Sequence, residues 1–198
     1  TMTSALPWCL ALGPLALVAS GLVAGAAKLP RRQAGTSAAL VAAFALAVAV
    51  AAGVAVALHG PFATVTVGIE GVGLGFYVDA LSAIMFALVA FVGLIVVVYS
   101  RNYLDGDPGQ DRFTQWLCLT LAAVLLLIVS GNLFQFALAW IATSVGLNKL
   151  LLFYPERQAA VLAARKKFIA SRVGDVCLVA AMVLLHQTFD SLDYAVLF

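Results

Sequence analysis

Charged residues are scarce in this chain, and their scarcity excludes a water-soluble fold. Only 10% of the 198 residues are charged and 64% are hydrophobic, and the mean hydropathy is +1.09. Soluble domains carry about 25% charged and about 45–50% apolar residues. So apolar a composition is typical of a chain that lies within a bilayer, and it predicts an all-α polytopic membrane protein.

Cysteine is also rare, and its spacing argues against a metal site or a disulfide framework. Cys9, Cys118 and Cys177 each lie in an apolar run, without a CxxC pair or a nearby histidine at metal-ligand spacing. The sequence contains no Ser/His/Asp set, no phosphate-binding loop and no paired carboxylates within one apolar run. It also has no basic run interleaved with aromatic residues, which argues against nucleic acid as a partner. Transport, or support of transport, is the class of function that remains, with no cofactor and no metal expected.

The sequence does contain a series of long apolar runs. As helices these runs would be about 27–35 Å long, which matches a hydrocarbon core of ~30 Å. The first run has no basic segment before it and is followed by Lys28, so we interpret it as a retained span rather than a signal peptide. About six transmembrane helices are predicted, at residues 5–27, 37–58, 79–99, 114–131, 133–153 and 168–186.

The basic residues indicate how these spans are oriented. Three connecting segments are rich in Lys and Arg, whereas residues 59–78, the turn at 131–132 and the tail 187–198 contain neither. The positive-inside rule places the basic segments in the cytoplasm and both ends of the chain outside. We therefore expect a multi-pass protein of the cell inner membrane with its N-terminus outside. All eleven basic residues fall on the cytoplasmic side: Lys28, Arg31, Arg32, Arg101, Arg112, Lys149, Arg157, Arg165, Lys166, Lys167 and Arg172.

Two connecting segments show structure of their own. Residues 59–78 alternate β-branched residues with glycine, which predicts a short extracytoplasmic hairpin. Pro155 and Glu156 suit the first turn of a helix, and residues 159–167 continue as a basic amphipathic helix on the cytoplasmic face. We expect this helix to lead into the sixth span without a full break.

Asp175 is the acidic residue that most needs an explanation, because it lies about two turns inside the sixth span. A charged side chain at the bilayer centre costs roughly 2.5–3.5 kcal/mol or more. Arg172, three residues earlier, shares its helix face and is its natural partner. Two interpretations stay open: the pair simply neutralises itself and locks the helix to its neighbours, or Asp175 is a titratable station on a proton or cation path.

Lys149 and Asp79 also lie close to the bilayer. Lys149, in the last turn of the fifth span, either snorkels to the headgroups or joins Arg172 and Asp175 in a charged cluster. Asp79 opens the third span, where a carboxylate is expected to cap the helix. The aromatic residues are assigned by position to the interfacial belts, namely Trp8, Trp116, Trp140, Tyr99, Tyr103 and Tyr154.

Several short motifs, in order along the chain, resemble those of antiporter-like membrane subunits. This superfamily includes the proton-pumping subunit L of respiratory complex I and the Mrp-type cation/proton antiporters. The resemblance runs from about residue 76 to 180, and the combination is specific although each piece alone is weak. The motifs are VDALS (78–82), YSRNYL (99–104), RF (112–113), GNL (131–133), VGL (145–147), ARKKF (164–168) and SRVGD (171–175).

The resemblance implies a position within a larger fold. Members have about fourteen or more spans with two inverted five-helix repeats, so this chain resembles the amino-terminal portion, the start of an antiporter-like helical bundle. Residues 1–113 would then form the first three helices together with the hairpin near 59–78. Residues 114–198 would begin the first repeat with the fourth to sixth helices.

One departure from the family pattern concerns the fifth span. In complex I and Mrp relatives a key glutamate follows a tryptophan, whereas here Trp140 is followed by residues without a carboxylate. The position of that glutamate corresponds to Ile141 or Thr143, depending on the alignment. The resemblance is stronger to the ion-translocating membrane component of DAB-type inorganic carbon pumps, through FYPER (153–157) and AARKKF (163–168).

This branch implies a function and a partner. Such a subunit would translocate protons or sodium ions to energise the uptake of bicarbonate or CO2 by a peripheral, zinc-bearing, carbonic-anhydrase-like subunit, and would itself hold no zinc and no quinone. It would be a transport subunit rather than an enzyme. Lys149, Arg172 and Asp175 are the candidate pathway charges. The candidate docking residues for the partner are Arg157, Arg165, Lys166 and Lys167.

Three alternatives stay open. The chain could belong to a proton-pumping, subunit L-like component of NADH:quinone oxidoreductase, and so to a translocating NADH dehydrogenase. It could belong to an Mrp-type cation/proton antiporter. It could also be a noncatalytic scaffold that binds a partner and passes no ions.

Overall fold

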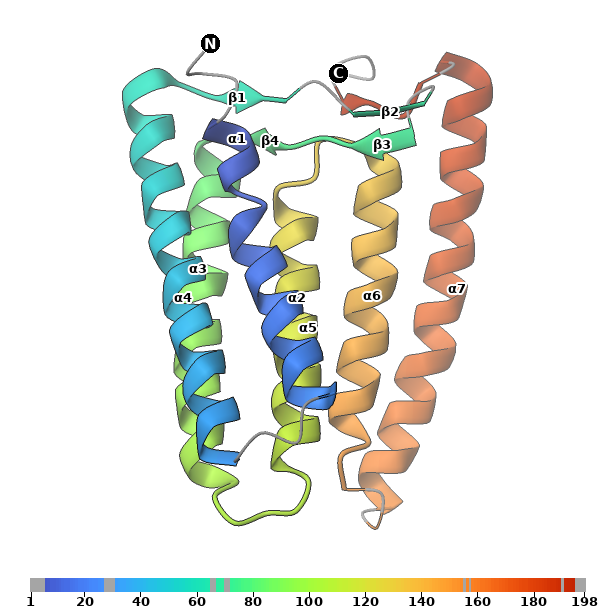
Figure 1. Cartoon of the computed structure of the whole chain (residues 1–198). Coiled ribbons are helices and arrows are strands. Elements are labelled where there is room, and N and C mark those ends of the chain that lie inside the picture. Colours follow the sequence, from blue (N-terminus) through green and yellow to red (C-terminus); the bar gives the residue numbers. More distant parts are fainter. Residues whose placement is uncertain are drawn as a thin grey trace.

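The structure is a bundle of long helices with short strands across one end (Figure 1). It is a computed structural model that describes residues 6–26, 31–64, 67–69, 72–154, 156, 158–189 and 191–194. The helices are α1 (Leu6–Cys9), α2 (Leu12–Ala26), α3 (Arg31–His59), α4 (Ala80–Tyr103), α5 (Gln110–Ile128), α6 (Leu133–Leu151) and α7 (Gln158–Phe189). Three residues to which the sequence assigns a role, Lys28, Pro155 and Arg157, lie outside the described residues.

The prediction of an all-α membrane protein with about six spans is confirmed. Within the described residues, five helical segments are long and apolar enough to cross a bilayer: Trp8–Gly25, Gly35–His59, Ala80–Tyr103, Gln110–Ile128 and Gln158–Phe189. The sixth long helix, α6, has 19 residues and lies between α5 and α7 (Figure 1). Gln135, Asn148 and Lys149 place polar groups along it.

The first span is divided into α1 and α2. Pro14 occupies the first turn of α2, where its missing N–H costs nothing because the first four amides of a helix have no partner within the helix. Its ring would clash with the carbonyl four residues earlier if one helix continued through this point. The helical path therefore breaks at residues 10–11 before α2 begins.

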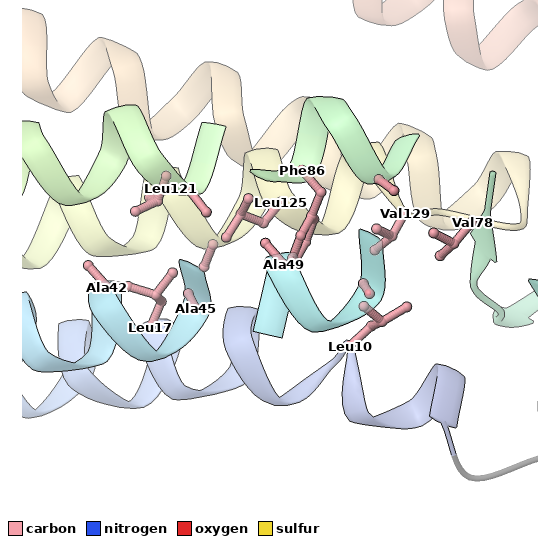
Figure 2. Packing of buried hydrophobic residues seen from close by; sticks show 14 of the residues in the cluster. Leu10, Leu17, Ala42, Ala45, Ala49, Val78, Phe86, Leu121, Leu125 and Val129 are labelled. Atoms are coloured by element: carbon pink, nitrogen blue, oxygen red, sulfur yellow. The ribbon is translucent and has the colours of Figure 1, made fainter. Parts of the chain in front are cut away.

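The core of the bundle depends on small side chains in α3. Five alanines spaced three or four residues apart lie on one face of this helix and are at most 6% exposed: Ala38, Ala42, Ala45, Ala49 and Ala52. Figure 2 shows this face beside Leu17 of α2, Phe86 of α4 and Leu121 and Leu125 of α5. Small residues let helix backbones approach closely, so helix packing within a membrane favours them.

The strands lie at the end of the bundle where α3 ends and α4 begins, which we call the hairpin end (Figure 1). β1 (Phe62–Ala63) pairs with β4 (Tyr77–Val78), and β2 (Val67–Ile69) pairs with β3 (Val72–Leu74), both antiparallel. Gly60, with φ of 81°, allows the sharp turn out of α3 because it has no Cβ.

Hydrogen bonds at the hairpin end join three segments that lie far apart in the sequence. The Gly131 amide donates to the Gly75 carbonyl at 2.8 Å, and the Leu133 amide donates to the Leu192 carbonyl at 3.0 Å. Asn132 is fully buried between them; its side-chain oxygen caps α6 at the Phe134 amide. The hairpin, the α5–α6 turn and the segment after α7 therefore form one junction.

The opposite end carries the exposed side chains of Arg165 and Lys166 near the start of α7, and we call it the basic end. The α4–α5 connection, residues 104–109, lies there too (Figure 1). α7 runs from this end to the hairpin end without a break. The amphipathic segment and the sixth span predicted from sequence are therefore one helix of 32 residues.

Candidate functional site

Asp175 lies inside α7 and is buried, with 7% of its surface exposed. Its Oδ2 atom is 2.6 Å from the Arg172 Nη2 atom, so the ion pair predicted from the three-residue spacing is confirmed. In an environment of low dielectric an ionised carboxylate needs such a partner. The pair explains how α7 tolerates the charge.

A second contact to Asp175 comes from the neighbouring helix. The Trp140 indole Nε1 of α6 donates a hydrogen bond to Asp175 Oδ1 at 3.1 Å. Trp140 is the eighth of the 19 residues of α6, so it lies in the middle of the helix and its assignment to an interfacial belt was wrong. A tryptophan away from the ends of an apolar run was the available sequence signal, because its N–H needs a partner when it is desolvated.

Arg172 is only partly compensated by its neighbours. Its guanidinium carbon lies 5.1 Å from the centroid of the Phe168 ring, one turn earlier on α7. Its Nε and Nη2 atoms are buried and donate no hydrogen bond to any of the residues that the structure describes, although Nη2 makes the ion pair. Arg172 therefore holds Asp175 mainly by charge.

Lys167 extends this cluster toward the basic end, which sequence reasoning missed. Its ammonium group donates to the Ser144 carbonyl of α6 at 3.0 Å. Lys167 and Asp175 are eight residues apart, which puts them on the same face of α7, and Ser144 and Trp140 are one turn apart on α6. We call Trp140, Ser144, Lys167, Arg172 and Asp175 the polar seam between α6 and α7.

The other basic residues at the start of α7 are placed differently. Arg165 and Lys166 are exposed at the basic end, whereas Lys167 is turned toward α6. Arg157, the fourth predicted docking residue, lies outside the described residues. The structure therefore does not place the four candidate docking residues together on one surface.

Lys149 is separated from the polar seam. Its Nζ atom lies 5.8 Å from the centroid of the Trp116 ring on α5. Nine residues separate Lys149 from Trp140, which corresponds to a rotation of about 180° around α6 at 3.6 residues per turn. Of the three candidate pathway charges, the structure brings Arg172 and Asp175 together and places Lys149 on the opposite face of α6.

A large apolar cavity lies beside α6. It has a volume of about 920 Å³ and is lined by α2, α5, α6 and β3, with no ionisable side chain among its lining residues. Gln135 is its most polar wall residue, and the Gly75 amide donates to the Gln135 side-chain oxygen at 3.0 Å. Such a lining offers no charged group for an ion, so the polar seam is the better candidate for ion chemistry.

Asp79 has a structural role at the hairpin end. Its carboxylate accepts hydrogen bonds from the Ser82 amide at 2.8 Å and from the Ser82 hydroxyl at 2.7 Å, which confirms the predicted helix cap. These bonds to Ser82, the backbone one first, hold the pKa of Asp79 below its ordinary value. Within the part of the chain that the structure describes, no group of three or more His, Cys, Asp or Glu residues could hold a metal ion.

Family models match two separate stretches of the chain. The model described as "NADH-Ubiquinone oxidoreductase (complex I), chain 5 N-terminus" matches residues 65–114. The model described as "NADH:quinone oxidoreductase/Mrp antiporter, TM" matches residues 130–198, which include the whole polar seam. Together the two matches cover more than half of the chain.

Curated relatives fall into two groups. A protein of Halothiobacillus neapolitanus named "Probable inorganic carbon transporter subunit DabB2" is 43% identical over 128 residues, which is 65% of this chain and 23% of the relative. A DabB protein of Hydrogenovibrio crunogenus is 40% identical over 126 residues, 63% of this chain and 24% of the relative. NADH-quinone oxidoreductase subunit L of Mycobacterium tuberculosis is 35% identical over 127 residues, 64% of this chain and 20% of the relative. The matched segment thus spans about a quarter or less of the length of these relatives.

A solved structure shares the fold. A chain of the membrane-bound sulfane sulfur reductase, an archaeal respiratory membrane complex, superposes with a TM-score of 0.77 at 15% identity. The superposition covers 97% of this chain and 38% of the other. It shows that the helical bundle has the fold of a chain from that complex. By its two family models, the chain belongs to the family of antiporter-like membrane subunits found in complex I and the Mrp antiporters.

Proposed function

We propose that this chain is part of a subunit that translocates protons or sodium ions to power the uptake of inorganic carbon, with Asp175 as the ion-binding station. The observation that carries the proposal is the burial of Asp175 between Arg172 and Trp140 inside the membrane-spanning bundle. Ionisable residues within spans are costly and mark ion pathways by default.

Asp175 differs from the other acidic residues because it lies in the interior of a predicted span. The other acidic residues are Glu70, Asp79, Asp105, Asp107, Asp111, Glu156, Asp190 and Asp193, and none lies in the interior of a predicted span. An arriving proton or cation would compete with Arg172 for the carboxylate, because both are attracted to the same charge. Asp175 can therefore alternate between pairing with Arg172 and binding the ion.

The missing carboxylate on α6 fits this assignment. At the positions that correspond to the glutamate of complex I and Mrp relatives, α6 carries Ile141 and Thr143. Trp140 supplies a hydrogen-bond donor to Asp175 instead. In this branch the ion-binding residue would therefore be Asp175 of α7, oriented by Trp140 of α6. Lys149 would serve a separate step of ion transfer next to α5.

The excess of Lys and Arg at the basic end supports a cytoplasmic location for that end in the inner membrane, with the N-terminus outside. The exposed Arg165 and Lys166, together with Arg157, would then face a peripheral partner. We propose a zinc-bearing, carbonic-anhydrase-like subunit for that place, on the strength of the similarity to DabB proteins. Labelling of Lys166 from the periplasm would contradict this orientation.

The test is the substitution Asp175→Asn in the intact transport complex. Asparagine keeps the shape and the hydrogen-bond acceptor for Trp140 but removes the charge, so gradient-driven uptake of labelled bicarbonate should fall while assembly is retained. Asp105→Asn, which removes an exposed carboxylate from the α4–α5 connection, is the matched control and should leave uptake unchanged. Normal uptake by the Asp175→Asn protein would reject the role of Asp175.

A second function is a proton-pumping subunit of an NADH:quinone oxidoreductase, favoured by the 35% identity to subunit L. The polar seam would serve proton movement there as well. Copurification distinguishes the two, since redox subunits would accompany the protein in one case and a zinc protein in the other.

A further inference from the structure

We propose that Lys167 is a charge gate that controls how cations reach Asp175 from the basic end. This inference rests on the proposed function of Asp175 and names a residue that governs access to it. Lys167 is the residue of the polar seam nearest to the basic end, because α7 begins there and Lys167 precedes Arg172 and Asp175 along it.

A groove opens at the basic end, next to the polar seam. It has a volume of about 420 Å³ and lies between the end of α6 and the start of α7. Asn148 and Leu152 line it from α6, and Ala164, Arg165 and Phe168 are among the residues that line it from α7. Asn148, in the wall of the groove, is one helical turn from Ser144, whose carbonyl binds Lys167.

The polar atoms beyond the groove follow a regular spacing on α6. Asn148, Ser144 and Trp140 are four residues apart, so they form a row along one face with steps of about 6 Å. The Asn148 Oδ1 atom is buried and accepts no hydrogen bond from any described residue, which is the state of a group that water or an ion satisfies. The row ends at Asp175, because Trp140 donates to that carboxylate.

Lys167 lies across this row. Its ammonium group is held on the Ser144 carbonyl at 3.0 Å, between Asn148 and Trp140 along α6. About 12 Å along α7 separate Lys167 from Asp175. A cation that moved along this row from Asn148 toward Asp175 would have to pass this positive charge, and Arg165 adds a second one in the wall of the groove.

In this proposal Lys167 has two states, of which the structure shows the first. With its ammonium group on the Ser144 carbonyl, it repels cations that move along the row from Asn148, and Asp175 stays paired with Arg172. With its flexible stem turned away, the row from Asn148 to Trp140 is open to a cation. Such a gate would prevent a leak between the two sides of the membrane.

The experiment measures how fast a cationic, water-soluble carbodiimide modifies Asp175 in inside-out membrane vesicles that contain the intact transport complex. Modification is read by mass spectrometry of the peptide that contains Asp175. Lys167→Met removes the charge at similar length, and labelling should become about tenfold faster, as expected for one charge at about 12 Å and an effective dielectric constant of about 20. Lys167→Arg keeps the charge and should label as slowly as the wild type.

Arg112→Met is the matched control, since this exposed side chain in the first turn of α5 also removes one positive charge and makes no contact with the polar seam in the described structure. Equal acceleration by Arg112→Met and Lys167→Met, or no acceleration by Lys167→Met, would overturn the gate. Lys167→Gln, which keeps a donor for the Ser144 carbonyl but no charge, should behave like Lys167→Met, and it decides the outcome if the methionine variant does not accumulate.

The gate and the ion station can fail separately. If Asp175→Asn abolishes uptake but Lys167→Met leaves labelling unchanged, the gate is wrong and the ion station stands. If Lys167→Met accelerates labelling but Asp175→Asn transports normally, access is controlled as proposed and the transport role of Asp175 is wrong.

Discussion

The α2–α5 part of the bundle and the α6–α7 pair are built on different principles. In the first, a row of buried alanines on α3 packs against leucine and phenylalanine side chains of three other helices. In the second, α7 buries only Ala164 and Asp175 within the described residues, and its polar contacts run to Trp140 and Ser144 of α6. Close apolar packing therefore holds the helices of the first part together, whereas polar contacts join the two helices of the second part.

This difference indicates which part of the bundle can change its conformation. An interdigitated apolar core has few alternative arrangements, because shifting one helix opens voids or creates clashes. A polar seam can exchange partners, because Asp175 contacts both Arg172 and Trp140 and keeps one of them when the other contact breaks. We therefore expect substitutions in the first part to lower stability and substitutions in the second to alter transport.

The largest effect on stability is expected from overpacking the alanine face. Ala49→Leu forces three extra carbons into a fully buried position on α3, which should cost up to about 3 kcal/mol and lower the thermal unfolding midpoint in detergent. Ala47→Leu, on the exposed side of the same helix, is the matched control and should leave the midpoint unchanged. Equal midpoints for both variants would mean that α3 is not held by its alanine face.

The junction at the hairpin end should be the next most sensitive point. Asn132→Ala removes the cap of α6 at the Phe134 amide and the hydrogen bond from Asn132 Nδ2 to Asp193 at 2.8 Å. The expected loss is about 2 kcal/mol, measured by the same thermal unfolding. Asn102→Ala, at an exposed site in the last turn of α4, should have little effect.

A smaller loss of stability but a clear loss of transport is expected at the polar seam. Trp140→Phe keeps the ring but removes the indole donor to Asp175, at a cost of about 1.5 kcal/mol for a bond to a charged group. Bicarbonate uptake should fall because the carboxylate is no longer oriented by α6. Trp8→Phe, at an exposed site in α1 away from the polar seam, is the control; if the two variants transport equally well, the Trp140 contact has no role in transport.

The smallest effect concerns the cap of α4 and its dependence on pH. Asp79→Ala should cost about 1 kcal/mol at neutral pH, because the ionised carboxylate accepts two bonds from Ser82. Since these bonds lower the pKa of Asp79 in the folded protein, its contribution is complete above about pH 4 and is lost as the pH falls through the folded-state pKa. The wild type and Asp79→Ala should therefore converge in stability in acid, and a constant difference would contradict the assignment.

Part of the candidate site could be predicted from the sequence. The pairing of Arg172 with Asp175 follows from the pitch of a single helix, so three residues of separation were sufficient. The contacts of Trp140 and Lys167 could not be predicted in the same way, because each joins α6 to α7 across 35 and 23 residues of sequence. The alternative in which Lys149 joins Asp175 had no such local basis, and the rotation of α6 places Lys149 toward α5.

By itself the sequence determined that this is a membrane-spanning helical protein, where its helices run and which of its charges need compensation. The physical reason is that hydrocarbon demands long apolar runs with internally bonded backbones, and both are local properties of the chain. Only the tertiary structure decided which helix faces meet, and so which groups surround Asp175. That choice depends on how α6 and α7 are rotated against each other, which is settled by packing and polar contacts between segments far apart in the sequence.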